Sequence, residues 1–285
     1  MTNIRVDVRG SVGIITIDRR ERFNSLDVET ARDLRKAGLQ LARDGNVRAA
    51  ILRGEGGVFC SGADLKYIRA GGDADDMEYL CRTGNPACPD KRDRLSYTYG
   101  EIFKQILEYI HSTISEIRRA AKPFIAAVDG IAAAGGFGLA MSCDLVIASE
   151  RATFEWAYAK TGLTGAESST FFLPRLVGFR RAMDLLFLNP RLDAKRAYEM
   201  GLVSAVQPVD GFDDAVFAIA QRLAEGPTEA LGIAKALMNE AAGMDRLDYH
   251  LDREIDNLAR IADGANFAEG IAAFFEKRPA AFGVK

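Results

Sequence analysis

The chain has 285 residues, of which 48% are hydrophobic and 27% are charged, proportions that are ordinary for a folded globular protein. Its 37 Lys and Arg residues stand against 40 Asp and Glu residues, so the formal net charge is −3 and gives no sign of a nucleic-acid partner. Single hydrophobic cores stop growing near about 250–300 residues, so the length fits one large domain or two smaller ones.

Cysteine and histidine are scarce, which limits the metal-binding chemistry that the chain can support. The four cysteines form no C-x-x-C pair and there are only two histidines, so we expect no metal site. The first ten residues lack the pattern of a secretion signal, and glycines and Asp129 interrupt the most apolar stretch, Phe124–Met141. We therefore expect a cytoplasmic protein with neither a membrane nor a nucleic-acid partner.

The first part of the chain is predicted to form strands around one helix. Apolar residues alternate in Ile4–Val8 and Val12–Ile17, which indicates two strands joined by a turn at residues 9–11. Ser25 or Asp27 caps a following helix, and Ala49–Leu52 is a short buried strand. Strand, helix and strand in this order predict a parallel sheet.

The same order returns in the middle of the chain. Helical spacing covers Glu101–Ala121, and Pro123 separates this helix from a buried strand at Phe124–Val128. A glycine-rich turn then leads to a short helix at Phe137–Cys143. Further strands are predicted at Leu145–Ala148 and Thr153–Phe154, and later helices at Phe171–Leu176, Arg180–Leu188, Ala194–Met200, Phe212–Ala224, Thr228–Ala241 and Leu247–Ile261.

The segment Gly71–Tyr99 breaks this rhythm. It combines a Gly-Gly pair, an acidic run, two prolines and two cysteines without a clear period. Irregular segments longer than about 12–15 residues are usually lids, binding loops or linkers, and the sequence leaves a solvated linker and a substrate-facing lid equally open.

Two turns rich in small residues each follow an apolar strand. The first is Phe59–Leu65 and the second is Asp129–Gly136, which opens a helix. Small residues let a ligand approach the backbone, and N–H groups at a helix start point outward as donors. If the two turns converge, their amides form an oxyanion hole, although close packing of strand and helix also requires glycine. The chain has neither a G-x-G-x-x-G nor a P-loop motif, which argues against nucleotide chemistry.

These turns resemble motifs of the crotonase, or enoyl-CoA hydratase/isomerase, superfamily. Phe59–Leu65 is similar to its first signature, and Lys122–Asp144 to its second. Four further segments resemble family motifs in the usual order: Arg22–Leu26, Leu173–Gly178, Ala197–Val203 and Phe274–Pro279. The resemblance extends from about Val6 to Phe282, nearly the whole chain.

The resemblance implies an α/β fold with a core of stacked ββα turns and a C-terminal helical region used in trimerisation. We accordingly expect residues 1–200 to form the core with the CoA and acyl sites, and residues 201–285 to form the helical region. It also implies a coenzyme A thioester as the substrate, no cofactor beyond its CoA moiety, and a homotrimer or a hexamer built as a dimer of trimers.

Functional residues are carried over from the family by position. The amides of Ala63 and Gly135 are expected to hold the thioester oxygen as negative charge develops on it. Side chains expected along the CoA moiety are those of Arg22, Phe23, Asp64 and Lys66, and Lys277 in the C-terminal motif is expected to reach a CoA phosphate, including that of a neighbouring subunit.

The family's hydratases use two glutamates, and this chain has neither. Gly138 and Tyr158 occupy the two positions. Tyrosine titrates near pH 10 unless it is strongly perturbed, so it cannot replace a carboxylate at neutral pH. Simple hydration of an enoyl-CoA is therefore doubtful, and the bulky Trp156 and Tyr158 either line an acyl pocket or belong to the core.

Glu167 is our candidate general base. Other branches of the family carry an acid in the loop at residues 162–169, where gapless alignment gives Ala166 and a shift of one residue gives Glu167. We expect proton transfer through a thioester enolate, an isomerase-type reaction. The alternative for Glu167 is a glutamate that merely stabilises a helix N-terminus.

Two other functions stay open. His111 lies twelve residues before Pro123, where a branch that dehalogenates chlorinated benzoyl-CoA carries a histidine, so dehalogenation or thioester hydrolysis with Glu167 as nucleophile is the second enzymatic reading. The alternative for His111 is a helix-surface or packed histidine without a catalytic role. The third reading is an acyl-CoA-binding scaffold that has lost catalysis.

Overall fold

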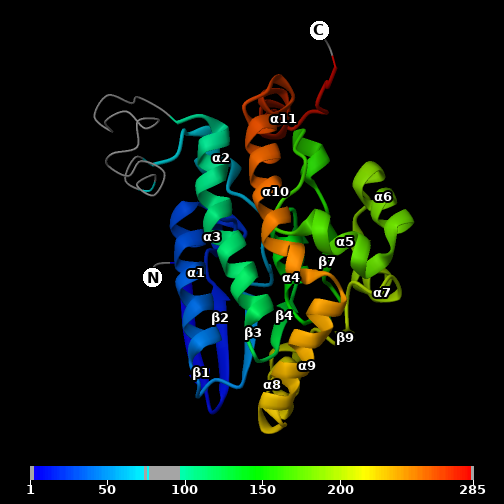
Figure 1. Ribbon diagram of the computed structural model, residues 1–285. Coiled ribbons are helices and arrows are strands. Elements are labelled where there is room, and N and C mark those ends of the chain that lie inside the picture. Colours follow the sequence, from blue (N-terminus) through cyan, green and yellow to red (C-terminus); the bar gives the residue numbers. More distant parts are fainter. Residues whose placement is uncertain (1–2, 74–75, 77–96, 284–285) are drawn as a thin grey trace, which may run out of the picture.

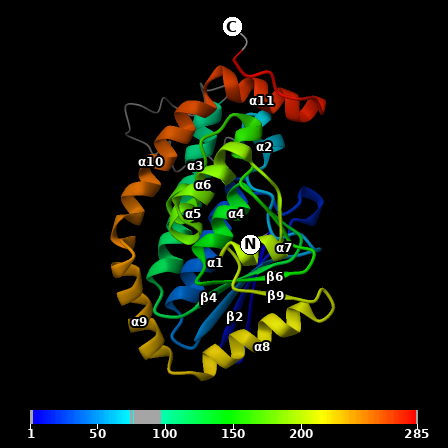
Figure 2. The ribbon, with the colours of Figure 1, turned by 90° about the vertical axis from the view of Figure 1, so that its right-hand side faces the viewer.

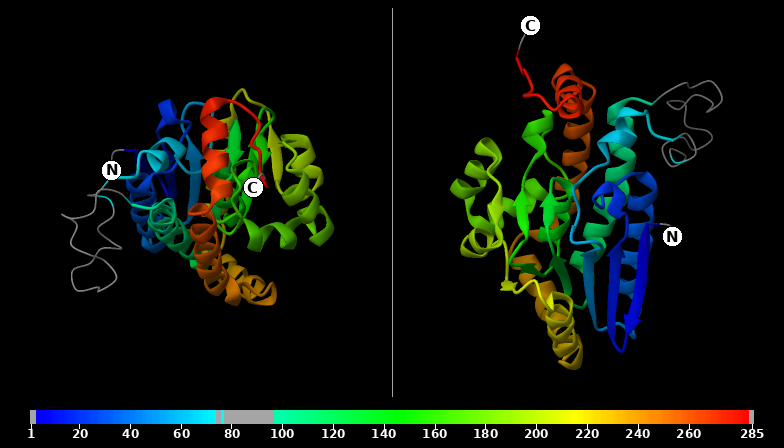
Figure 3. Two further views of the ribbon diagram at one scale, coloured as in Figure 1. Left: turned by 90° about the horizontal axis from the view of Figure 1, so that it is seen from above. Right: turned by 180° about the vertical axis from the view of Figure 1, so that it is seen from behind.

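A computed structural model describes residues 3–73, 76 and 97–283 of the chain. Its centre is a six-stranded sheet in the order β1-β2-β3-β4-β6-β9, seen from behind in the right-hand view of Figure 3. Within this sheet only β1 and β2 pair antiparallel, and every later neighbour is parallel, as predicted from the strand-helix-strand order. The strands are β1 (Ile4–Arg9), β2 (Val12–Ile17), β3 (Ala49–Gly54), β4 (Phe124–Val128), β6 (Leu145–Ser149) and β9 (Ala205–Gln207).

The sheet is covered on both faces at its centre, which explains why β4 is apolar and buried throughout. In β4, Phe124, Ala126 and Val128 enter the main core, whereas Ile125 and Ala127 pack with residues of α8 (Phe212–Glu225) on the opposite face. Helices α1 (Val28–Arg43), α3 (Tyr99–Arg119) and α10 (Leu247–Ala262) lie on the main-core side, where α3 contacts both of the others (Figure 1). Helix α8 crosses the far face (Figure 2).

A second, small sheet stands beside the first. It has the order β5-β7-β8, with β5 (Ile131–Ala133), β7 (Thr153–Glu155) and β8 (Leu192–Asp193). The remaining helical segments are η1 (Arg20–Arg22), α2 (Leu65–Arg69), α4 (Gly135–Ser142), η4 (Tyr158–Thr161), α5 (Ser169–Val177), α6 (Phe179–Leu188), α7 (Ala194–Glu199), α9 (Thr228–Ala241), η5 (Met244–Arg246) and α11 (Ala265–Glu276).

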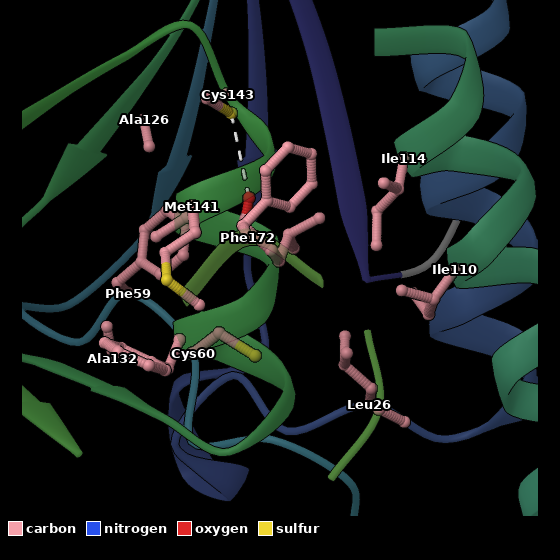
Figure 4. Close-up of a cluster of buried hydrophobic side chains, with 14 of the residues drawn as sticks. Leu26, Phe59, Cys60, Ile110, Ile114, Ala126, Ala132, Met141, Cys143 and Phe172 are labelled. Atoms are coloured by element: carbon pink, nitrogen blue, oxygen red, sulfur yellow. Dashed lines mark hydrogen bonds between the residues drawn. The ribbon is translucent and has the colours of Figure 1, made fainter. Parts of the chain in front are cut away.

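The main core joins α4 to the sheet and to α3. The two turns rich in small residues, Phe59–Leu65 and Asp129–Gly136, are called the glycine-rich turns below. Figure 4 shows Phe59 and Met141 near these turns and Ile110 and Ile114 facing them from α3. All four side chains are at most 4% exposed. Strand-turn-helix units stacked on one core are the crotonase-like α/β architecture that the resemblance implied.

Most predicted elements are present within a few residues of their expected bounds. Asp27, one of the two candidate caps, accepts a hydrogen bond from Thr30 N–H at 2.9 Å at the start of α1. The short α2 and β5, and also β8, β9 and α11, were not predicted. Beyond residue 200, β9 pairs with β6 and α8 packs on the sheet, and the expected division at residue 200 stays a prediction.

The remaining expectations concern the segment Gly71–Tyr99, the cysteines and membrane-spanning helices. Most of the segment Gly71–Tyr99, with Cys81 and Cys88, lies outside the described residues, whereas Cys60 and Cys143 are buried free thiols. In the part of the chain that the structure describes, no helix combines the length and the apolar character that crossing a bilayer requires.

Candidate active site

The two glycine-rich turns meet, and backbone hydrogen bonds hold them together. Cys60 N–H donates to the Ile131 carbonyl, and Ala133 N–H donates to the Cys60 carbonyl, both at 3.0 Å. A Cβ on Gly136 would lie 2.1 Å from the Cys60 carbonyl oxygen, so only glycine fits there. The glycines at the start of α4 thus allow the two turns to approach each other.

Ala63 and Gly135, one from each turn, therefore line the same cavity. Neither backbone N–H donates a hydrogen bond to another protein atom among the described residues. Gly135 begins α4, where the helix dipole adds positive potential, and Ala134 before it has a left-handed φ of 47°. Two free amides on a shared cavity are the arrangement that stabilises a developing oxyanion.

The cavity has a volume of about 340 Å³ and a largely apolar wall. The side chains of Leu65, Phe103, Leu163 and Phe274 contribute to that wall. Phe103 comes from α3 and is 3% exposed, whereas Phe274 of α11 is 57% exposed. The wall of the cavity thus includes a buried ring from α3 and an exposed ring from α11.

The carboxylate of Glu167 lies deep in this cavity. The residue is 3% exposed, in the loop before α5, with a left-handed φ of 50°. A Cβ added to Gly135 would lie 2.7 Å from Glu167 Oε1, so the carboxylate stands directly beside the start of α4. The sequence-derived candidate base is therefore next to one of the two candidate oxyanion donors.

Burial and two neighbours set the protonation of Glu167. The pKa of Glu167 is raised to about 8 by the sum of three effects: desolvation raises it most, a hydrogen bond from the Tyr158 hydroxyl to Oε2 lowers it, and the nearby charge of Glu254 raises it. The pKa of Tyr158 is well above its usual 10, because burial and the charge of Glu167 both disfavour the phenolate. Tyr158 therefore keeps its proton, and Glu167 is a carboxyl group that exchanges a proton near neutral pH.

His111 lies behind Glu167 rather than in the cavity. Its ring is 5% exposed on α3, and Nε2 accepts the Glu167 backbone N–H at 3.1 Å. Burial lowers the pKa of His111 to about 4, so the ring is neutral at physiological pH with its proton on Nδ1. His111 holds the backbone of Glu167 but does not line the cavity.

The two aromatic residues proposed for the acyl pocket differ in position. Tyr158 lines the cavity, whereas Trp156 packs behind it with a ring-centroid distance of 5.0 Å to Tyr158. A Cβ on Gly165 would lie 2.7 Å from Trp156, which shows how closely the loop before Glu167 wraps around that ring. Trp156 thus supports the loop from the core.

Four of the residues expected along the CoA moiety surround one side of the cavity, namely Arg22, Phe23, Asp64 and Lys66. Asp64 is buried and caps α2, and it is paired with Arg22 at 3.2 Å and with Arg19 at 2.9 Å, so its carboxylate organises this wall. Phe23 is 60% exposed with a left-handed φ of 54°, and Lys66 is exposed.

Lys277 lies apart from these residues. It is the exposed, left-handed C-cap of α11 and does not line the cavity of its own chain. Its expected contact with a CoA phosphate stays a prediction, as does the trimer that would bring it to a neighbouring site. Within the described ranges, no group of three or more His, Cys, Asp or Glu side chains is placed to hold a metal ion.

Sequence reasoning missed several residues of the site. Phe103 lines the cavity but matches only an ordinary helical apolar position, and Phe274 also lines it, although the C-terminal motif that contains it predicts no role for that residue. Lys160 also lines it and forms an ion pair with Glu155. Glu254 of α10 contacts the loop of Glu167 from far along the chain, and no local pattern distinguishes it from a surface glutamate.

Comparison with known proteins agrees with this geometry. The family model described as "Enoyl-CoA hydratase/isomerase" matches residues 7–83 and 100–285. The chain is 31% identical to "4-chlorobenzoyl coenzyme A dehalogenase-2" of Arthrobacter sp. over 96% of this chain and 91% of that one. It is 32% identical to "1,2-epoxyphenylacetyl-CoA isomerase" of Escherichia coli K12 over 96% of both chains.

A solved structure shares the whole architecture. The crystal structure of an enoyl-CoA hydratase from Mycobacterium avium subsp. paratuberculosis K-10 superposes with a TM-score of 0.82 and 29% identity, over 99% of each chain. The similarity therefore includes the elements beyond residue 200 as well as the glycine-rich turns.

Proposed function

The chain belongs to the enoyl-CoA hydratase/isomerase family of acyl-CoA enzymes, and we propose that within it this protein moves a proton through a thioester enolate, with Glu167 as the base. The observation that carries this proposal is the Glu167 carboxylate beside Gly135 in the cavity that Ala63 also lines. A base and the oxyanion donors then face the same substrate atoms.

The proposed reaction needs only one carboxyl group. With a 3-enoyl-CoA as substrate, Glu167 takes a proton from C2, and the C2–H electron pair moves to the thioester carbonyl, whose oxygen becomes an enolate. The Ala63 and Gly135 amides hold that charge. The enolate then collapses, the double bond shifts to C2–C3, and Glu167 returns its proton to C4. No water or second acid enters.

The charge state of Glu167 suits a group that both accepts and returns a proton. General acid–base catalysis is most effective when the pKa of the group lies near the working pH. Burial brings the pKa of Glu167 to about 8. Water addition is less well supported, because Gly138 and Tyr158 stand where hydratases of the family carry two glutamates.

Replacing Glu167 tests the proposal. We expect Glu167→Gln to slow the conversion of a 3-enoyl-CoA to its 2-enoyl isomer by about 10²–10⁴-fold, with CoA binding retained. Incorporation of deuterium from D₂O at the carbon next to the thioester should fall in parallel. Asp256→Asn, which removes an exposed carboxylate on α10, is the matched control. Full turnover by Glu167→Gln would refute the proposed role.

One observation favours a second candidate. A relative is named as a 4-chlorobenzoyl-CoA dehalogenase, and the carboxylate of Glu167 is accessible to a substrate carbon in the cavity. Attack by the carboxylate would leave a covalent aryl- or acyl-enzyme, which intact-mass measurement after acid quenching would detect. Its hydrolysis needs a base for water, and His111, turned to the Glu167 backbone, does not line the cavity.

A further inference from the structure

A buried carboxylate lies on the opposite side of the Glu167 loop from the cavity. Glu254, on α10, is 5% exposed and does not line the cavity. Its oxygens accept hydrogen bonds from the backbone N–H of Ser168 at 2.8 Å and of Thr170 at 3.1 Å, and also from the Thr170 hydroxyl. Three donors from one short segment converge on a single side chain.

The segment that Glu254 holds is conformationally costly. Glu167 and Ser168 are consecutive residues with left-handed φ values of 50° and 62°. Non-glycine residues persist in such conformations only where the surroundings fix them. Ser168 precedes α5, but its hydroxyl donates to the Glu167 carbonyl instead of capping the helix. Glu254 therefore takes over the capping of α5 from another helix.

The two left-handed residues are held from two helices. His111 on α3 accepts the N–H of Glu167, and Glu254 on α10 accepts the N–H of Ser168. The two side chains themselves lie 3.7 Å apart, from Nε2 to Oε2, where α3 and α10 pack together (Figure 2). Successive amides beside the catalytic carboxyl are thus fixed by groups 143 positions apart in the chain.

Stability alone does not explain a carboxylate at this position. Burying a charged group costs several kcal/mol, and a well-packed apolar replacement of a buried ionic group is often neutral or stabilising. A local cap by the Ser168 hydroxyl would satisfy the helix start without a buried charge. The free-energy cost of burying the Glu254 charge is explained if residues 167–170 must hold one particular conformation.

We propose that Glu254 is a positioning residue for Glu167, which fixes the left-handed Glu167–Ser168 turn so that the carboxylate of Glu167 stays beside Gly135. This inference rests on the proposed role of Glu167 as the base. Glu254 touches no substrate atom, because it lies outside the cavity. Its action passes through the backbone of residues 167–170.

The charge of Glu254 adds a second, measurable effect. The groups facing Glu167 are Tyr158 from η4, Cys60 from the first glycine-rich turn, His111 from α3 and Glu254 from α10, with His250 beyond it. Burial raises the pKa of Cys60 to about 12 and lowers that of His111 to about 4, so both are neutral near pH 7. Glu254, whose pKa is lowered, is the anion that raises the pKa of Glu167.

The experiment compares Glu254→Gln with Glu254→Asp, which keeps the charge on a shorter side chain, and with Asp256→Asn as the control on the same helix. Amide hydrogen exchange at residues 168 and 170 is followed by mass spectrometry or NMR. Turnover of a 3-enoyl-CoA is followed as a function of pH. We expect Glu254→Gln to speed exchange at both amides by about fivefold or more and to lower kcat by about 10–100-fold with a smaller change in KM.

The pH profile separates positioning from a merely structural contribution. Removing the Glu254 charge should move the acid limb of kcat/KM to lower pH, whereas Glu254→Asp should leave that limb near its original place. If Glu254→Gln has the wild-type rates of amide exchange at residues 168 and 170 and the wild-type kcat, the proposal is overturned. A lower Tm with unchanged kcat and pH profile would overturn it too. If Glu254→Gln fails to fold, the same exchange and kcat criteria apply to Glu254→Asp.

The two proposals fail in different ways. Full turnover by Glu167→Gln removes the catalytic role of Glu167, while amide exchange at residues 168 and 170 in Glu254→Gln still decides whether Glu254 holds the turn. An inactive Glu167→Gln beside a fully active Glu254→Gln removes only the positioning role.

Discussion

Glu167 occupies the space that a side chain at Gly138 would need. A Cβ built on Gly138 would lie 2.3 Å from the Glu167 carbonyl oxygen and 2.9 Å from the Glu167 Cβ. Position 138 is one of the two at which hydratases of the family carry a glutamate. A side chain at position 138 and the observed left-handed Glu167 therefore exclude each other in this structure.

Restoring the missing glutamate should therefore not restore hydration. We expect Gly138→Glu to lose isomerisation of a 3-enoyl-CoA, to gain no water addition, and to lower the free energy of unfolding by about 1–3 kcal/mol, because the new side chain displaces the 167–168 backbone. Gly45→Ala is the matched control, since its added Cβ meets no atom within 4 Å, and it should change stability by less than about 0.5 kcal/mol. Urea unfolding and product analysis measure both effects, and efficient hydration by Gly138→Glu would contradict this account.

Tyr158 should tune the pH at which the enzyme works. Its hydrogen bond lowers the pKa of Glu167 from what burial alone would give, so Tyr158→Phe should raise that pKa above about 8. A base acts in its ionised form, which is populated above its pKa. The acid limb of kcat/KM should consequently move to higher pH, by about one unit. A limb that stays in place or moves to lower pH would show that Tyr158 does not contact the base in solution.

His111 should act as a hydrogen-bond acceptor and not as an acid or base. His111→Phe leaves the buried Glu167 N–H without a partner, so we expect about 1–3 kcal/mol lower stability and reduced kcat. His111→Gln can keep an acceptor oxygen near the position of Nε2 and should retain most of the activity. Measuring kcat and urea unfolding for both variants decides the point, because a proton-transferring histidine would lose activity equally in the two.

Lys66 should contribute to binding of the CoA moiety and not to chemistry. The side chain is exposed beside the cavity, so its attraction to an anionic ligand is screened by water and salt. We expect Lys66→Ala to weaken CoA binding by about 1.5–5-fold, with kcat unchanged and a smaller effect at high salt. Isothermal titration with CoA measures this, and Lys195→Ala, an exposed lysine of α7 outside the cavity, is the control.

The secondary structure that follows from local rules could be predicted from the sequence. β4 coincides with the predicted range Phe124–Val128, because an apolar run after a proline has few other conformations. Asp27 caps α1 as one of two predicted candidates. By contrast, β9 has three partly buried residues and exists through its pairing with β6, which no local pattern encodes.

The residues of the site also divide into those that local sequence predicts and those that only tertiary structure brings together. Ala63, Gly135 and Glu167 belong to short motifs, and the structure brings all three to one cavity. Glu254 carries no motif, because its role depends on the packing of α10 against α3. The position of His111 relative to Pro123 suggests a role in the chemistry, whereas its contact with the Glu167 backbone depends on tertiary structure.

The placement of Glu254 on α10 also has a consequence for how the protein becomes active during synthesis. Every strand of the main sheet, both glycine-rich turns and Glu167 itself are translated before residue 210. The carboxylate that fixes the Glu167–Ser168 turn emerges from the ribosome more than forty residues later. On the roles proposed above, a nascent chain can therefore complete its sheet and both glycine-rich turns before Glu254 is available, and Glu167 is held in position only when α10 docks against α3.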